Sequence, residues 1–473
     1  MALSWNSYQS WLKDILATSR FPKTPPPSPE TISTDSRQIK NGDWFIPLIG
    51  ENFDGHNFIK EVVSKGASGF FYTSSYKDKL DKSLCEKGVE VSDTLKALQA
   101  IAHGLRRTLG HTKIIALTGS TGKTTTKEMT GLLLQQIGKT YFSKESFNNE
   151  IGVPLSLLKL SQNHRYTVLE FGARHQGDIE FLNSLAEPDV VACLNIGITH
   201  LGEFGSIEKL VETKLEIFRQ SQKNSILVAF NDDSRILNAA KKMDRKLITF
   251  GLNPGANVRV KDVSFKKQPN GPVMDIEFEV YRKNISASFS FAHSAYPINL
   301  AAAIAMSLAA GADTESITKS LNNINLQNIG GGGRFNLISL GPLTLIDDCY
   351  NANPDSIKAG LETLSKIYPK EKKVLVLGEM LELGPESERL HRAVGEICAS
   401  IKPSFLITVG TEAQAINDAA LKKGLNQQSV VHFSNVDELM AANFNLQTFG
   451  SIIFVKGSNG VKLSKYIAHL KTK

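Results

Sequence analysis

Beyond residue 112 the chain alternates short β-branched runs with stretches of helical periodicity, and this alternation constrains the fold most strongly. The runs KIIALTG, YTVLEFGA, VVACLNIG, SILVAFND and KLITFG have the length and composition of buried strands. Strands that alternate with helices indicate a parallel sheet with helices on its faces and with sites at the carboxyl ends of the strands. We therefore predict an α/β fold.

The chain is long enough for more than one hydrophobic core, because its 473 residues exceed the usual size of a single domain. Residues 1–108 contain an opening helix, the proline-rich connector FPKTPPPSPE and a small α/β unit. Residues 109–329 form the central unit, in which the period-two segment 258–291 predicts an antiparallel addition followed by an alanine-rich helix.

The glycine run in IGGGGRF marks the second boundary, because consecutive glycines do not form a stable element interior. Beyond it, LTLIDD, KVLVLGEM, SFLITVG and SIIFVKG repeat the strand–helix alternation, so residues 330–473 are predicted to form a Rossmann-like α/β unit. This part has no GxGxxG fingerprint, and we predict no dinucleotide there.

The charge, the cysteines and the apolar runs of the chain indicate which classes of partner and which location to expect. The net charge of +7 comes from 54 basic and 47 acidic residues scattered along the chain, which disfavours a nucleic-acid interface and is compatible with an anionic small substrate. The four cysteines form no C-x-x-C pair, as is typical of reduced thiols. No run is long and apolar enough to span a bilayer. We expect a cytoplasmic protein.

The stretch IIALTGSTGKTTTKEM predicts a phosphate-binding loop between a strand and a helix that begins near Thr124. Its first glycine is Gly119, so the loop is shorter than the usual pattern with four residues between its glycines. Helix N-terminal N–H groups and the helix dipole favour phosphate, Lys123 would reach the terminal phosphates, and the Thr124 hydroxyl would bind Mg²⁺. An ordinary glycine turn is the alternative. The predicted ATP-binding residues of the loop are Gly119, Ser120, Thr121, Gly122, Lys123, Thr124 and Thr125.

Two further side chains are candidates for the metal. Glu170 ends the run YTVLEFG and His200 follows the run VVACLNIG. Taken singly, each would more often be a rim residue or a turn residue. Their common place at the binding edge of one sheet favours a Mg²⁺ site, because Mg²⁺ needs only one or two protein ligands besides phosphate oxygens.

A family resemblance rests on several stretches in a fixed order. TGSTGKTT, SFNNEIGVP, LEFGARHQGDI, ITHLGEFGS, TKLEIF, IDDCYNANPDS and VLGEMLELG match the motifs of the Mur ligases, and the match runs from about Asp35 to the C-terminus. The shortened loop is the form that this family uses. The resemblance implies three domains: an N-terminal domain for the UDP end of the substrate, a central ATPase domain and a C-terminal domain that closes over ATP.

The resemblance also implies roles for single residues. The segment TDSRQIKNGDWFIPLIGENFDGHNF resembles the family's uridine-binding segment, which makes Ser36 and Arg37 candidates for substrate contacts, although Asp35 to Arg37 could be only a turn. Asn149 is placed on the muramoyl side. Lys214 matches a lysine that becomes carbamylated and helps to hold a second Mg²⁺, whereas the sequence alone would favour an exposed helix lysine.

Further positions concern ATP and the peptide site. Asn299 matches a residue near the adenine, and Arg334 and Asp348 match C-terminal contacts to ATP. Asn351, Asn353 and Pro354 lie in the stretch that points most specifically to one branch of the family. The chain departs from the family pattern at Ala295, where a histidine is usual, at Arg174 and at Asn459.

The function implied is that of an ATP-dependent amide ligase that joins D-alanyl-D-alanine to UDP-N-acetylmuramoyl-tripeptide through an acyl phosphate, releasing ADP and phosphate. The expected catalytic residues are Lys123, Lys214 and His200, and the expected cofactors are ATP and Mg²⁺. The enzyme would act in peptidoglycan synthesis and would thereby affect cell shape and division. We expect a monomer. A sibling ligase that adds the third amino acid, a folylpolyglutamate synthetase and a phosphate-loop nucleotide switch remain open alternatives, although the guanine motif N-K-x-D is missing.

Overall fold

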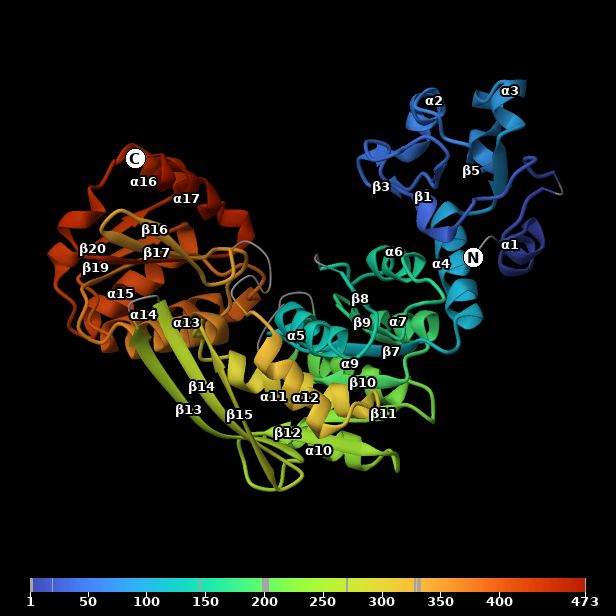
Figure 1. The fold of residues 1–473 in the computed structure, drawn as a ribbon. Coiled ribbons are helices and arrows are strands. Elements are labelled where there is room, and N and C mark those ends of the chain that lie inside the picture. Colours follow the sequence, from blue (N-terminus) through green and yellow to red (C-terminus); the bar gives the residue numbers. More distant parts are fainter. Residues whose placement is uncertain are drawn as a thin grey trace.

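The computed structural model describes residues 3–18, 20–143, 146–197, 204–268, 271–326, 329 and 333–472. Three α/β units follow one another along the chain, and Figure 1 shows the first and the third at opposite ends of the central one. This arrangement agrees with the predicted three-domain α/β class. Within the described residues, no helix combines the length and the hydropathy that a membrane span requires.

The N-terminal unit is built on a parallel sheet of order β1-β2-β5-β6. In the segment DWFIPLIG, whose apolar residues predict a strand, the regular strand β2 covers only two residues and ends before Pro47, which has no N–H to donate. The helix α4 (Thr94–Thr108) closes the unit and packs on α1 and also on α6 and α7 of the central unit. The other elements are α1 (Trp5–Leu12), β1 (Ile32–Ser33), β2 (Trp44–Phe45), the hairpin β3 (Ile49–Gly50) and β4 (Phe53–Asp54), α2 (Ile59–Ser64), β5 (Gly69–Thr73), α3 (Lys82–Cys85) and β6 (Gly88–Val91).

The central unit contains a nine-stranded sheet of order β15-β14-β13-β12-β11-β10-β7-β9-β8. The pairs from β8 to β13 are parallel, and β13, β14 and β15 pair antiparallel, which confirms the predicted antiparallel addition. The strands are β7 (Lys113–Thr118), β8 (Thr140–Phe142), β9 (Tyr166–Glu170), β10 (Val190–Cys193), β11 (Ile226–Phe230), β12 (Leu247–Gly251), β13 (Val258–Gln268), β14 (Gly271–Val280) and β15 (Lys283–Phe289).

Helices cover both faces of this sheet because its central strands are apolar on both sides. In β7, Ile115 and Leu117 belong to the core beneath α5 and α11, whereas Ile114 and Ala116 belong to the core on the opposite face, which also includes α4 residues. One face carries α5 (Lys123–Gln135), α11 (Tyr296–Ala309) and α12 (Thr314–Asn323), and the other carries α6 (Gly152–Leu158), α7 (Asp178–Ala186), α9 (Ile207–Arg219) and α10 (Ser234–Lys241).

The C-terminal unit has a six-stranded sheet of order β16-β17-β21-β18-β19-β20, parallel except for β16. The predicted alternation is confirmed. Its elements are β16 (Asn336–Leu340), β17 (Leu343–Asp348), α13 (Pro354–Ile367), β18 (Lys373–Gly378), α14 (Ser387–Ser400), β19 (Phe405–Val409), α15 (Gln414–Lys422), β20 (Val430–Phe433), α16 (Val436–Ala441), β21 (Ile452–Lys456) and α17 (Leu463–Lys471).

The long β13–β14 hairpin joins the central unit to the C-terminal unit, and in Figure 1 it reaches toward α13 and α14. Near its tip, Lys267 forms an ion pair with Glu371 and lies over the ring of Tyr368. The ammonium of Lys366 in turn lies over the ring of Phe265. These contacts hold the two units against each other on the side of the hairpin.

Candidate active site

The predicted phosphate loop connects β7 to α5, and the structure confirms the strand–loop–helix context. Gly122 has φ +75°, a left-handed conformation that favours glycine, and it precedes the helix, which begins at Lys123. A Cβ on Gly122 would lie 2.8 Å from the Asn299 Oδ1 atom, so the side chain of Asn299 in α11 packs directly against the loop. The structure thus brings Asn299, predicted near the adenine, to the predicted phosphate site.

Asn195, just beyond β10, holds the loop from the neighbouring strand. Its Oδ1 accepts hydrogen bonds from the backbone N–H groups of Ser120 (3.0 Å) and Thr121 (2.9 Å), and its Nδ2 donates to the Thr121 carbonyl (3.0 Å). The Ser120 hydroxyl also donates to the carbonyl of Gly197 and accepts from its N–H. Asn195 was not among the predicted site residues, although it follows the carboxyl end of a central strand, the same signal that marks Glu170.

Lys123 lies at the mouth of the loop. Its ammonium donates to the carbonyls of Gly119 (2.9 Å) and Ser120 (3.4 Å). Burial lowers its pKa; the Glu170 carboxylate opposes this shift, and the charge of Arg334 adds to it. A half-buried cation beside the N–H groups of a helix N-terminus is suited to bind an anion.

Thr124 and Glu170 meet, as predicted, at the edge of the sheet. The Thr124 hydroxyl donates to Glu170 Oε2 over 2.8 Å, and Asn148 Nδ2 donates to Glu170 Oε1 over 2.8 Å. The hydroxyls of Thr124 and Ser146 are 3.0 Å apart. The glutamate is only 2% exposed, so it is not the solvated rim residue of the alternative interpretation. His200, the other predicted metal ligand, lies outside the described residues.

Lys214 is buried in α9 at 2% exposure, so the alternative interpretation as an exposed helix lysine is wrong. The helix turns this side chain toward the sheet, where desolvation and the nearby charge of Lys123 lower its pKa to about 7. Glu170 acts in the opposite direction, which places Lys214 within electrostatic reach of two predicted site residues. A buried amine with this pKa has a substantial neutral fraction near neutrality.

The C-terminal unit closes one side of the site. A cavity of about 310 Å³ is lined by Ser120 and Lys123 from the loop and by C-terminal residues, among them Asn459. The guanidinium of Arg334 lies 4.0 Å from the centre of the Tyr350 ring, and the Tyr350 hydroxyl is 3.5 Å from Ser146 Oγ. The other residues that line the cavity are Tyr350, Asn351, Ala352, Asn353, Leu381, Glu382, Leu383, Ser458 and Gly460.

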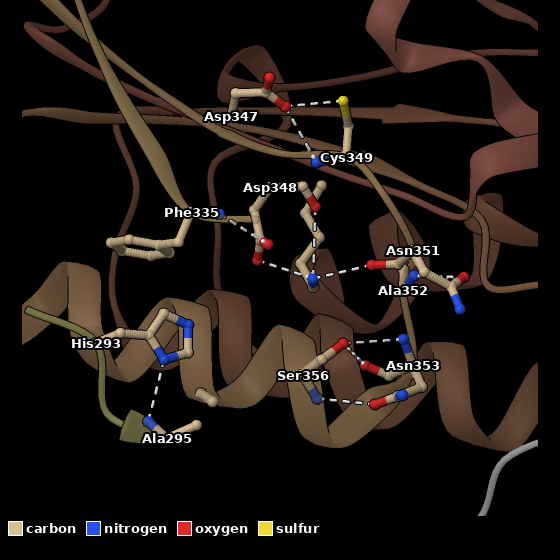
Figure 2. Close-up of polar contacts among 12 residues, drawn as sticks. His293, Ala295, Phe335, Asp347, Asp348, Cys349, Asn351, Ala352, Asn353 and Ser356 are labelled. Atoms are coloured by element: carbon tan, nitrogen blue, oxygen red, sulfur yellow. Dashed lines mark hydrogen bonds and ion pairs between the residues drawn. The ribbon is translucent and has the colours of Figure 1, made fainter. Parts of the chain in front are cut away.

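Asp348, a predicted ATP contact, makes its hydrogen bond and its ion pair within the C-terminal unit. Figure 2 shows its carboxylate accepting from the N–H of Phe335, and it also pairs with the ammonium of Lys456 at 2.8 Å. Lys456 donates further to the carbonyl of Asn351, which lines the cavity. Burial raises the pKa of Asp348, and the charge of Lys456 opposes this shift. The carboxylate supports the cavity wall and is not among the residues that line the cavity.

A histidine, His293, lies close to Ala295, the position at which the chain lacks the histidine that is usual in the family. His293 Nδ1 accepts from the N–H of Ala295 over 3.1 Å (Figure 2). Its ring centre is 4.7 Å from that of Phe335 and 5.1 Å from that of Tyr296. Burial, together with the charge of Lys456, lowers the pKa of His293 to about 3. The imidazole is therefore neutral and packs where the central unit meets the C-terminal unit.

The predicted substrate residues lie outside this constellation. Asp35 accepts from the backbone and the guanidinium of Arg37 in a turn, and the Arg37 side chain is 86% exposed on the N-terminal unit. The Ser36 carbonyl accepts from Lys65. Asn149 Oδ1 accepts from the N–H of Gly152 at the start of α6. Arg174 is exposed, and its N–H donates to Asp178.

A largely parallel sheet that places a glycine loop, a half-buried lysine and a hydroxyl–carboxylate pair opposite a second α/β unit is typical of a nucleotide-dependent enzyme. Family models match three parts of the chain: "Mur ligase family, catalytic domain" over residues 30–106, "Mur ligase middle domain" over 117–307, and "Mur ligase, glutamate ligase domain" over 333–459. The chain belongs to the Mur ligase family and is an ATP-dependent ligase.

Individual relatives agree with this assignment. The UDP-N-acetylmuramoyl-tripeptide--D-alanyl-D-alanine ligase of Bacillus subtilis (strain 168) is 32% identical over 93% of this chain and 92% of its own length. A crystal structure of MurF from Acinetobacter baumannii superposes with a TM-score of 0.85 at 31% identity, over 99% of this chain and 98% of that one. MurF from Thermotoga maritima, solved in complex with ADP, gives a TM-score of 0.77 at 26% identity over 94% and 98%.

Proposed function

We propose that this protein joins D-alanyl-D-alanine to UDP-N-acetylmuramoyl-tripeptide in peptidoglycan synthesis, at the expense of ATP. The observation that carries the proposal is the meeting of Lys123, Thr124 and Glu170 at one edge of the central sheet, beside a cavity closed by the C-terminal unit. The names of the relatives at about 30% identity supply the two substrates.

ATP would bind with its phosphates on the loop. Lys123 would place its charge on the terminal phosphates, and Arg334 would add a second cation from the C-terminal side. Asn299 would lie beside the nucleotide, where it already packs against Gly122. Contacts from two units make closure a requirement of the reaction, and closure would also exclude water from the activated substrate.

Mg²⁺ fits the residues present, because Thr124 and Glu170 offer a hydroxyl and a carboxylate oxygen within one hydrogen-bond distance of each other. Bound there, the ion would neutralise charge on the transferring phosphoryl group. Lys214 would contribute as a carbamate, since its buried amine has a pKa of about 7 and the neutral form reacts with CO₂. We propose His200 as a further ligand.

The reaction would then follow in two steps. The tripeptide carboxylate attacks the γ-phosphorus, the bond to ADP breaks, and an acyl phosphate forms. The dipeptide amine attacks the activated carbonyl, loses a proton and expels phosphate, which leaves an amide. Lys123 and Arg334 would stabilise the negative charge that develops on the phosphoryl oxygens in the first step.

The N-terminal unit would hold the UDP end of the substrate. The exposed guanidinium of Arg37 and the neighbouring Ser36 are suited to anionic and polar groups of a nucleotide-sugar, and Asn149 would meet the muramoyl part. We propose the domain bounds 1–108, 109–329 and 330–473, a cytoplasmic location and a monomer.

An acceptor panel tests the proposed activity. The protein is incubated with ATP, Mg²⁺ and UDP-N-acetylmuramoyl-tripeptide, and with D-alanyl-D-alanine, single amino acids or glutamate as acceptor, and the products are identified by mass. The proposal expects the pentapeptide nucleotide with the dipeptide only. A product with a single amino acid would support a sibling ligase. A polyglutamylated folate, formed in a parallel reaction, would support a folylpolyglutamate synthetase. ATP hydrolysis without any coupling would support a nucleotide switch.

A further inference from the structure

The loop between β7 and α5 is two residues shorter between its glycines than the usual phosphate loop, and a side chain from another strand compensates for this shortness. Asn195 uses its whole amide on the loop: Oδ1 accepts from Ser120 N–H and Thr121 N–H, and Nδ2 donates to the Thr121 carbonyl. The backbone carbonyl of Asn195 also accepts from Ser120 N–H at 3.2 Å. No other side chain among the described residues makes as many hydrogen bonds to the loop backbone.

These bonds fix the direction of the peptide groups. In a trans peptide the C=O and the following N–H point in opposite directions, and the chain has no cis peptide bond within its described residues. Because Asn195 holds the Thr121 carbonyl, the N–H of Gly122 faces away from Asn195. The N–H groups of Ser120 and Thr121 are already taken, so the N–H groups left for an anion are those from Gly122 into the first turn of α5.

We propose that Asn195 is the positioning residue that sets the shortened loop in its phosphate-binding conformation. The inference rests on the proposed function, because it assumes that the anion is the phosphate chain of ATP. Asn195 acts through the loop backbone and does not itself touch the nucleotide. Without it, the Thr121–Gly122 peptide is free to rotate, and the N–H cradle loses its common direction.

The segment that carries Asn195 is closely packed against its neighbours, so Asn195 has little room to adopt another position. Gly119 packs against the neighbouring segment, because a Cβ there would lie 3.0 Å from Leu194 Cβ and 3.4 Å from Asn195 N. Gly197, which bonds the Ser120 hydroxyl, in turn faces the carboxylate of Asp355 at the start of α13, 2.6 Å from where its Cβ would lie. The segment 195–197 therefore lies between the phosphate loop and the C-terminal unit.

The test is binding of ATP and of ADP, measured by titration calorimetry on the full chain, with the kinetic constants measured alongside. Asn195→Ala is expected to weaken nucleotide binding by about tenfold or more, because a buried loop amide loses its partner. The KM for ATP should rise accordingly, and the KM values for the peptide substrates should stay within twofold. Asn195→Asp keeps the acceptor but places an oxygen against the Thr121 carbonyl, so it should lose affinity too while it keeps the volume of the side chain.

Asn257→Ala is the matched control. Asn257 Oδ1 also accepts from a backbone N–H, that of Thr249 at 2.8 Å, in the same unit but between β12 and β13. It should bind ATP as the wild type does. Wild-type affinity in both Asn195 variants, or an equal loss in Asn257→Ala, would overturn the inference. Failure of the wild-type protein to bind ATP would instead refute the proposed function, so the two failures are distinguishable.

Discussion

Lys123 is half-buried at the end of the phosphate loop, where its ammonium donates to two loop carbonyls. Lys123→Ala should leave the fold intact, because the side chain is half-buried and its truncation removes a donor from only two loop carbonyls. Turnover should fall by at least about 100-fold, since a cation that stabilises the transferring phosphoryl group is lost. The measurement is kcat for phosphate release, with circular dichroism as a check of folding.

Lys113→Ala is the control for this change. Lys113 begins the same strand, β7, at its opposite end, and pairs with Asp189 at 2.9 Å on the surface. Its loss should alter stability slightly and turnover not at all, because exposed ion pairs contribute little. Near wild-type turnover in a folded Lys123→Ala protein would contradict the phosphate assignment.

Lys214 should carry a carbamate, because it is buried and its lowered pKa supplies a neutral amine. With ¹³C-bicarbonate, the wild-type protein is expected to show a carbamate carbon resonance that Lys214→Gln lacks. Turnover of Lys214→Gln should fall about 100-fold, as expected for the loss of a group that orders metal and phosphate. Lys209→Gln, an exposed lysine of the same helix, should keep both the signal and the activity. A carbamate resonance that persists in Lys214→Gln would show that Lys214 is not the carbamylated residue.

The residues of the site were predictable to different degrees. Lys123, Thr124 and Glu170 follow from a local motif and from the rule that strand ends meet at one sheet edge. The burial of Lys214 was not predictable from its helix, because it depends on which face α9 turns toward the sheet. Tyr350 and Ser146 come from different units, and no local pattern marks their approach.

At the scale of elements, the connection between β15 and α11 should make the protein acid-sensitive. The pKa of His293 is lowered from 6.5 to about 3, so the unfolded chain binds a proton that the folded chain excludes. The contribution of His293 to stability is complete above about pH 6.5 and is lost as the pH falls toward 3. At pH 5 the loss amounts to up to about 2 kcal/mol.

His293→Gln removes this titration and keeps a polar side chain. The decrease in Tm between pH 7 and pH 5 should therefore be smaller in the variant than in the wild type. Differential scanning calorimetry at both pH values gives the comparison. His469→Gln, a histidine of the C-terminal helix α17, serves as a control that should follow the wild type. Equal decreases in wild type and His293→Gln would show that His293 is protonated without cost.

Elements with a strong periodic signal were predicted, and short ones were not. The buried runs that became β7, β9, β10, β11 and β12 lie in a sheet with helices on both faces, so these runs are apolar on both sides and can be recognised in the sequence. β8 and β20 are short strands at the edges of their sheets and carry little signal, because β8 has one buried residue and all four residues of β20 are only half-buried. The antiparallel β13–β15 segment was recognisable because only one of its faces is buried, which gives alternation.

At the scale of the whole molecule, the β13–β14 hairpin should help to set the C-terminal unit over the phosphate loop. Glu371→Lys places like charges at the contact with Lys267 and should lower kcat/KM for ATP by roughly two- to fivefold, as expected for a partly exposed pair. The double variant with Lys267→Glu restores opposite charges and should recover most of this loss. No recovery in the double variant would mean that the ion pair has no part in placing the unit.

The number and class of the units could be predicted, but their contacts could not. The glycine run and the restart of alternation indicate where one core ends and another begins. In the structure the cores are not separate, because α4 of the N-terminal segment packs on α6 and α7, and one cluster of buried residues spans the central and C-terminal units. Such packing depends on shape complementarity between distant segments, which periodicity does not encode.

In the proposed reaction, ATP cleavage on the loop is coupled to amide formation between the tripeptide substrate and the dipeptide. Its most direct test is phosphate release from ATP and Mg²⁺ by the wild-type protein, measured with both substrates and with each one omitted. We expect rapid release only when UDP-N-acetylmuramoyl-tripeptide and D-alanyl-D-alanine are both present, with one phosphate for each pentapeptide nucleotide formed. Equally rapid release without the dipeptide, or release with no amide product, would contradict it.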